Sequence, residues 1–155
     1  MVDRVLLVGE SNPYGADPRL ALYPEPPGCA GARLCVILGM TDREYLRTFH
    51  RVNLLEGPRW SAAQAKIAAG RWVAQFRVLL GARVTRAHDF DFKPWTRFDD
   101  HRGDCEYDCP RPASLCMHYV ILPHPSGRSR LWNEPGAAER ARRLVLALVE
   151  EARHG

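Results

Sequence analysis

The chain has 155 residues, with 22 Lys or Arg and 18 Asp or Glu, so its formal net charge at pH 7 is +4. This length suits one core, and we expect residues 1–155 to form a single domain. The sequence has no run of about 18 apolar residues and no secretory leader, which argues against a membrane protein and predicts a cytoplasmic one. The small positive surplus permits a polyanionic partner but does not by itself indicate one.

Five cysteines occur, at positions 29, 35, 105, 109 and 116. An odd number in a chain without a secretory leader predicts free thiols rather than disulfides. Cys105, Cys109, Cys116 and His118 are of the residue types that bind zinc, but their spacing fits no common zinc module. The other interpretation is a surface loop rich in Pro, Gly and Asp, and we predict no metal ligands.

Apolar runs that end in glycine or proline alternate along the chain with segments that begin at helix-capping residues. Thr41-Asp-Arg-Glu44 and Ser61-Ala-Ala-Gln64 are both capping-box patterns. The expected elements in chain order are a strand at 4–9, a long loop at 10–27, a short helix at 31–39, a helix at 42–49, a strand at 52–55, a helix at 61–76, a strand at 77–80, a brief helix after Gly81, an irregular segment at 89–112, a strand at 117–122 and a helix at 135–153 with Asn133 as its N-cap. The segment at 31–39 is also compatible with a strand, and we favour the helix because Leu34, Ile37 and Leu38 suit one helical face.

This alternation predicts an α/β fold with three layers, in which helices cover both faces of a short, mostly parallel, four-stranded sheet. Such sheets bind their ligands at the carboxyl ends of the strands. The segments Glu10-Ser-Asn-Pro-Tyr and Pro123-His-Pro-Ser both follow strands at that end. We therefore expect the two segments to face each other across one cleft.

His124 lies between two prolines, directly after the apolar run that ends at Leu122. Each proline fixes φ and lacks a backbone donor, so His124 cannot lie inside a helix or a central strand. The segment is therefore a rigid loop at the end of a strand. By itself it is compatible with a structural turn, in which the histidine caps a carbonyl, and with a functional site.

Gly9-Glu-Ser-Asn-Pro-Tyr-Gly15 after the first strand and His124-Pro-Ser-Gly-Arg128 after the last resemble the two signature motifs of the uracil-DNA glycosylase superfamily. In that family the two motifs flank the pocket for an extruded base. The order of the two motifs, their separation and the strands that precede them agree with those of the family, and the likeness spans nearly the whole chain. The resemblance implies the family's fold and the activity of a DNA-repair hydrolase, which flips uracil or another deaminated or modified base out of DNA and cleaves its N-glycosidic bond.

The resemblance further implies a monomer that binds single- or double-stranded DNA and needs no metal or nucleotide cofactor. Some relatives hold an iron-sulfur cluster with cysteines that partly precede the first motif. No cysteine precedes Cys29 in this chain, so we do not expect that cluster.

The second motif implies a role for each of its residues. His124 matches the histidine that hydrogen-bonds the base carbonyl and stabilises negative charge on the departing base. Ser126 matches the serine that contacts a backbone phosphate, and Arg128 occupies the position of the wedge that fills the vacated space in the stack. Arg130 is expected to bind DNA beside it. Gly127 stands where relatives usually have proline.

The first motif aligns in two ways. In one alignment Glu10 is the carboxylate that orients or activates water. In the other Asn12 positions the water and Tyr14 narrows the pocket, and we favour this one slightly because Pro13 and Tyr14 match along with Asn12. A carboxylate can take a proton and balance a positively charged sugar, whereas an amide can only orient water.

Two further residues are expected to bind the base. Asn53 matches the amide that pairs with the edge of a flipped pyrimidine, which needs both an acceptor and donors. Tyr23 is placed like the aromatic that stacks on the base, although a tyrosine packed within its loop is an equal alternative. Two other functions stay open: a glycosidase for a nucleotide or a hypermodified base, and a DNA-binding module of this fold without turnover.

Overall fold

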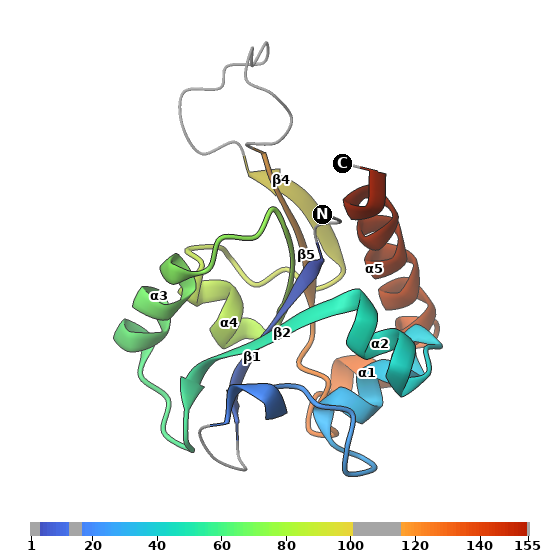
Figure 1. The fold of residues 1–155 in the computed structure, drawn as a ribbon, viewed down its shortest axis with the longest axis horizontal. Coiled ribbons are helices and arrows are strands. Elements are labelled where there is room, and N and C mark those ends of the chain that lie inside the picture. Colours follow the sequence, from blue (N-terminus) through green and yellow to red (C-terminus); the bar gives the residue numbers. More distant parts are fainter. Residues whose placement is uncertain (1–3, 13–16, 101–115, 155) are drawn as a thin grey trace.

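The structure is a computed structural model that describes residues 4–12, 17–100 and 116–154. Tyr14, Cys105 and Cys109, which the sequence predictions name, lie outside these ranges, as do Pro13 and Gly15 of the first motif. Helices flank both faces of one central sheet (Figure 1). The prediction of an α/β fold with a mostly parallel sheet is therefore confirmed.

The sheet has five strands in the order β2-β1-β3-β5-β4. The strands are β1 (Val5–Asn12), β2 (Phe49–Glu56), β3 (Phe76–Leu80), β4 (Thr96–Asp100) and β5 (Met117–Leu122). All neighbouring pairs are parallel except β4 and β5, which are antiparallel. The carboxyl ends of β2, β1, β3 and β5 consequently lie at one edge of the sheet.

The prediction of four strands was wrong because it missed β4. Its sequence Thr-Arg-Phe-Asp-Asp is short and mostly charged, and it lacks the apolar alternation of a typical strand. Pairing with β5 brings Phe98 against Tyr119, with the two rings stacked at 5.1 Å. Contacts with residues distant in sequence therefore outweigh the weak intrinsic tendency of this segment to form a strand.

The described residues form five α-helices around the sheet: α1 (Ala30–Leu38), α2 (Asp42–Thr48), α3 (Ala62–Arg71), α4 (Ala82–Ala87) and α5 (Ala137–His154). Figure 1 shows α1, α2 and α5 over one face and α3 and α4 over the other. At α2 the predicted capping box is present: the Glu44 backbone N–H donates to Thr41 Oγ1 at 3.2 Å, and the Thr41 backbone N–H donates to Glu44 Oε2 at 2.8 Å. None of the described helices combines the length and apolarity needed to cross a bilayer.

Two predicted helix boundaries were wrong. Helix α3 ends at Arg71 rather than near residue 76, because the Arg77 guanidinium donates to the carbonyls of Trp72 and Ala74 and holds the connection extended. Helix α5 begins at Ala137 rather than at residue 135. Gly136 precedes it with φ +77°, and Asn133 belongs to a separate 3-10 helix, η3 (Arg130–Asn133).

The first strand continues to Asn12, so Glu10 belongs to the strand and not to the predicted loop at 10–27. A second 3-10 helix, η1 (Pro18–Leu20), interrupts that predicted loop further on. Parallel pairing with β2 through Asn12 and Glu56 extends the strand past the apolar run. This longer strand fixes the backbone direction of Glu10 at the carboxyl edge.

Candidate active site

Gly81 follows β3 and separates two of the predicted catalytic residues. A Cβ atom placed on Gly81 would lie 3.2 Å from the Cβ of His124 and 3.5 Å from Oε1 of Glu10. Gly81 also has φ +96°, and its N–H donates to the Leu122 carbonyl at 2.8 Å. Position 81 thus requires glycine for two reasons: the backbone has a positive φ, and a side chain would fill the space between Glu10 and His124. The structure brings Glu10 and His124 together across the ends of β1, β3 and β5.

His124 is held as a neutral hydrogen-bond donor. The backbone N–H of Ser126 donates to His124 Nδ1 at 3.1 Å, so Nδ1 cannot carry a proton and the neutral ring carries it on Nε2. Burial lowers the pKa of His124 below its ordinary value of 6.5, while the charge of Glu10 partly opposes this shift. At neutral pH the Nε2–H is therefore available to an acceptor without a positive charge on the ring.

Trp132 of η3 fixes the position of this loop. Its indole Nε1 donates to the His124 carbonyl at 2.8 Å, and its ring packs edge-on against Trp95 at 5.1 Å. The guanidinium of Arg140 on α5 lies 5.6 Å from the Trp95 ring centroid. No local sequence pattern indicates a role for Trp132, because only the folded chain shows which acceptor its indole reaches.

Glu10 is half-buried and has a cationic neighbour. Arg83 Nη1 of α4 lies 3.7 Å from Glu10 Oε2, and the Arg83 guanidinium lies 5.5 Å from the Trp60 ring centroid. Asn12 is the last residue of β1 and pairs with Glu56. Of the two candidates for handling water, Glu10 is the one whose side chain is described, and it is next to the predicted leaving-group stabiliser.

Asn53 of β2 lies opposite Gly9 in the parallel register. A Cβ atom on Gly9 would lie 2.4 Å from Asn53 Oδ1, so the amide occupies the space above the glycine. Gly9 immediately precedes Glu10. Asn53 thus lies at the carboxyl half of the sheet, on the strand next to that of Glu10, and β1 and β3 separate it from β5 and His124.

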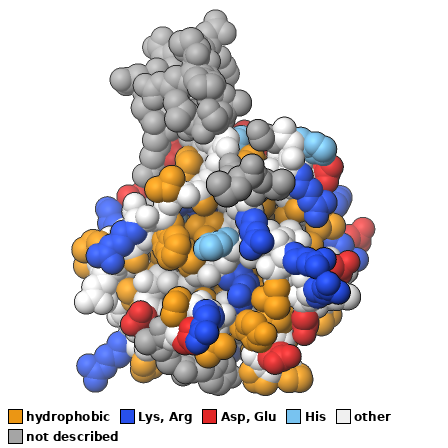
Figure 2. Space-filling view, in the orientation of Figure 1, with side chains coloured by type: hydrophobic (Ala, Val, Ile, Leu, Met, Phe, Trp, Pro, Cys, Tyr) orange, Lys and Arg blue, Asp and Glu red, His pale blue; other side chains and the backbone are white. Residues whose placement is uncertain are grey.

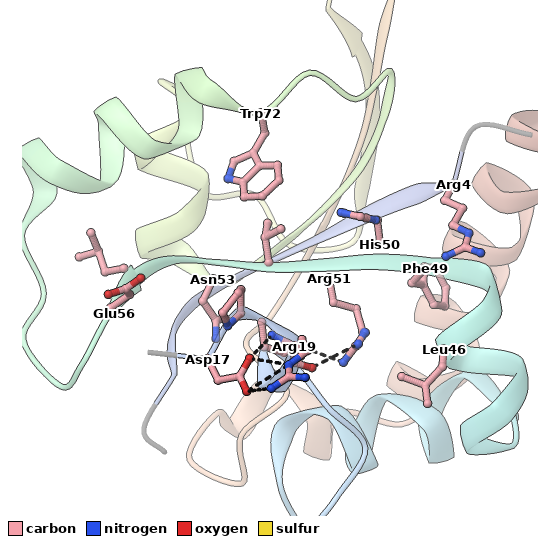
Figure 3. Close-up of a pocket in the computed structure, with 14 residues that line it drawn as sticks. Arg4, Asp17, Arg19, Leu46, Phe49, His50, Arg51, Asn53, Glu56 and Trp72 are labelled. Atoms are coloured by element: carbon pink, nitrogen blue, oxygen red, sulfur yellow. Dashed lines mark hydrogen bonds and ion pairs between the residues drawn. The ribbon is translucent and has the colours of Figure 1, made fainter. Parts of the chain in front are cut away.

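Asn53 also lines a pocket of about 380 Å³ along the free edge of β2 (Figure 3). Arginines 4, 19 and 51 line it as well, and Figure 2 shows Lys and Arg side chains on this side of the molecule beside hydrophobic ones. Neither Glu10 nor His124 is among its lining residues. We expected Asn53 to share one cleft with Glu10 and His124. The pocket that Asn53 lines at the edge of β2 is not that cleft.

Tyr23 is half-buried and has a partner within the protein. The Arg51 guanidinium lies 5.4 Å from its ring centroid, and Arg51 Nη1 donates to the Ala21 carbonyl at 2.9 Å. The Tyr23 carbonyl accepts a hydrogen bond from Cys29 Sγ at 3.2 Å. These contacts support the interpretation of Tyr23 as a tyrosine packed within its loop.

The loop after His124 carries the predicted DNA contacts. Ser126 is half-buried, whereas Arg128 and Arg130 are exposed. Gly127 contacts Arg33 of α1, since a Cβ atom on Gly127 would lie 3.0 Å from Arg33 Nη2. Arg33 adds a third exposed guanidinium to this loop, and nothing in the sequence around it indicated that position.

Cys29 and Cys35 are free thiols, as predicted. His118, the histidine among the residues of zinc-binding type, has other partners. Its Nδ1 lies 2.6 Å from Asp99 Oδ1, and its ring stacks on Phe76 at 4.8 Å. Within residues 4–12, 17–100 and 116–154, no group of three or more His, Cys, Asp or Glu side chains could hold a metal ion.

The chain was compared with protein-family models, with curated proteins and with solved structures, and none of the three comparisons finds a match.

Proposed function

We propose that the protein is an N-glycosyl hydrolase with the fold of the uracil-DNA glycosylase superfamily, which releases uracil or another deaminated or modified base from DNA. The proposal rests on the likeness of the two motifs and on the position of their residues. Glu10 ends up beside His124, and both lie where ligands of parallel sheets bind.

The observation that supports the proposal most strongly is the hydrogen bond from the Ser126 backbone N–H to His124 Nδ1, which leaves the proton of the neutral ring on Nε2. When an N-glycosidic bond breaks, its electron pair stays with the base, whose carbonyl oxygen becomes more negative. A preorganised neutral donor stabilises such a charge, and its effect is larger away from water. The bond from Ser126 to Nδ1 and the lowered pKa leave Nε2–H in that state at neutral pH.

Glu10 supplies the complementary charge in this proposal. The sugar becomes positively charged as the base departs, and a carboxylate stabilises it. A water oxygen then bonds to the sugar carbon that lost the base, and Glu10 accepts the proton that the water gives up. If Asn12 orients the water instead, Glu10 acts by charge alone.

The test is incubation with oligonucleotides that each carry one uracil, hypoxanthine, xanthine or 5-substituted pyrimidine, followed by alkaline cleavage at abasic sites. We expect cleavage of at least one of them by the wild-type protein. The matching free nucleotides are tested in parallel. Release from nucleotides alone supports the nucleotide-specific alternative, and binding without release from any substrate supports the silent DNA-binding module.

A further inference from the structure

We propose that a groove between α3 and α4 binds a phosphodiester and a neighbouring base of a nucleic-acid strand. The inference rests on the proposed function, because it places the part of the substrate strand that lies outside the base-binding site. The groove has a volume of about 480 Å³. Its lining consists of Trp60, Lys66, Arg83, Arg86 and three alanines at 62, 63 and 87.

The charge of the lining favours an anion. Three of its side chains are cationic and none is acidic. Lys66 Nζ lies 2.9 Å from Asp89 Oδ1, and Arg83 lies 3.7 Å from Glu10, so two of the cations are held in place by carboxylates outside the lining. Arg86 is exposed and has no acidic partner among the residues that the structure describes. Arg86 is thus the cation most available to a phosphate.

The groove also offers an aromatic surface. Trp60 is half-buried, and the Arg83 guanidinium lies 5.5 Å from its ring centroid. Single-stranded nucleic acid is held by this combination, because phosphates follow cations while bases stack on indoles and guanidinium planes. The three alanines leave the space between the helices unfilled, so a planar group has room beside Trp60.

The groove adjoins the candidate active site through one side chain. Arg83 belongs to the groove lining and also contacts Glu10, which lies beside His124. A strand that presents one base to Glu10 and His124 therefore has neighbouring nucleotides close to Arg83. A free nucleoside would leave the groove empty. The groove thus indicates a polynucleotide substrate rather than a monomeric one.

The experiment measures binding of a labelled, unmodified, single-stranded oligonucleotide by fluorescence anisotropy over a range of salt concentrations. Trp60→Leu keeps an apolar side chain but removes the stacking surface, and we expect about fivefold weaker binding or more. Arg86→Gln should lower the slope of log affinity against log salt by about 0.7, the value for one phosphate contact on a single strand. Arg143→Ala, which removes an exposed arginine of α5 on the other side of the sheet, is the matched control and should bind as the wild type.

The oligonucleotide contains no target base, so the result does not depend on base release. Unchanged binding by both Trp60→Leu and Arg86→Gln overturns the groove assignment, even if the wild type releases bases. If thermal unfolding shows that Trp60→Leu is not folded, Arg86→Gln alone decides. Equal competition by inorganic phosphate or poly-glutamate at matched charge also overturns it, because the groove would then bind anions without recognising a strand.

Discussion

The backbone N–H of Ser126 donates to Nδ1 of His124 at 3.1 Å, so a main-chain group and not a side chain sets the tautomer of the candidate leaving-group stabiliser. Substitution of the Ser126 hydroxyl leaves this bond intact. A contact between Ser126 and a DNA phosphate can therefore be tested separately from the chemistry at His124.

The first prediction concerns pH. Burial lowers the pKa of His124, so the neutral ring persists below pH 6.5, and protonation sets in only as the pH falls through the lowered value. Protonation removes the lone pair that accepts from Ser126 and disturbs the site. We expect base release to fall in this acid range, and the folded state to lose there the stability that the neutral ring contributes at higher pH.

A profile of kcat/KM between about pH 5 and 8 measures this effect. The control is His124→Asn, which keeps an N–H donor but does not titrate. Its profile should lack the acid decline that His124 causes. An identical decline in both proteins would assign the titration to another group.

The second prediction concerns Gly81. In Gly81→Ala the new methyl group meets Glu10 and His124 at a residue with φ +96°. The backbone strain should cost about 1–3 kcal/mol of unfolding free energy, and base release should fall as well because the two side chains are displaced. Denaturant unfolding and single-turnover release measure the two effects.

Gly136→Ala is the matched control for Gly81→Ala. Gly136 also has a positive φ, +77°, but a Cβ atom there would have nothing within 4 Å. The Gly136→Ala variant should lose about as much unfolding free energy as Gly81→Ala but release the base at the wild-type rate. Equal loss of release in the two variants would show that Gly81 matters only for the fold.

The third prediction links Gly9 to Asn53. In Gly9→Ala the Cβ would lie 2.4 Å from Asn53 Oδ1, so the amide has to move. If Asn53 reads the base, Gly9→Ala and Asn53→Ala should reduce discrimination between bases to a similar extent, and the double variant should lose little more. Competition between two modified oligonucleotides gives the ratio of kcat/KM values.

Gly70→Ala serves as the control for this third prediction. Gly70 lies inside α3, and a Cβ atom there has open space, so this change should raise stability by about 0.5–1 kcal/mol and leave discrimination unchanged. Full additivity of Gly9→Ala and Asn53→Ala would contradict a shared role.

The fourth prediction assigns a positioning role to Trp132. Trp132→Phe keeps an aromatic ring against Trp95 but removes the donor to the His124 carbonyl, at a cost of about 1 kcal/mol of stability. We expect kcat to fall while KM changes little, since the binding groups remain. Trp72→Phe, at a partly exposed tryptophan on the β2 edge, is the control. A rise in KM alone would indicate a binding role for Trp132.

Local patterns in the sequence predicted much of the fold. Thr41 and Glu44 form the expected capping box because their partners are only three residues apart. Residues 77–80 form a strand as predicted, and this strand, β3, also includes Phe76, which was expected to end the preceding helix. The charged strand β4 was missed because its stability depends on pairing with β5 and on the contact between Phe98 and Tyr119.

The candidate site was only partly predictable for the same reason. The resemblance of the two motifs singled out Glu10 and His124 as candidates, and the structure brings these two residues together. The contact of Asn53 with Gly9, the bond from Trp132 to the His124 carbonyl and the packing of Arg33 on Gly127 join distant parts of the chain. Side-chain partners of this kind depend on tertiary structure, for which a single sequence carries no local signal.

The most direct test of the central claim is single-turnover release of base by His124→Ala from whichever modified oligonucleotide the wild type cleaves. Loss of one preorganised donor to a developing anion should slow release by about 10²- to 10³-fold. Binding of the same oligonucleotide should stay nearly unchanged, since the arginines of the loop and the groove remain. Release at the wild-type rate by a folded His124→Ala protein would contradict the account.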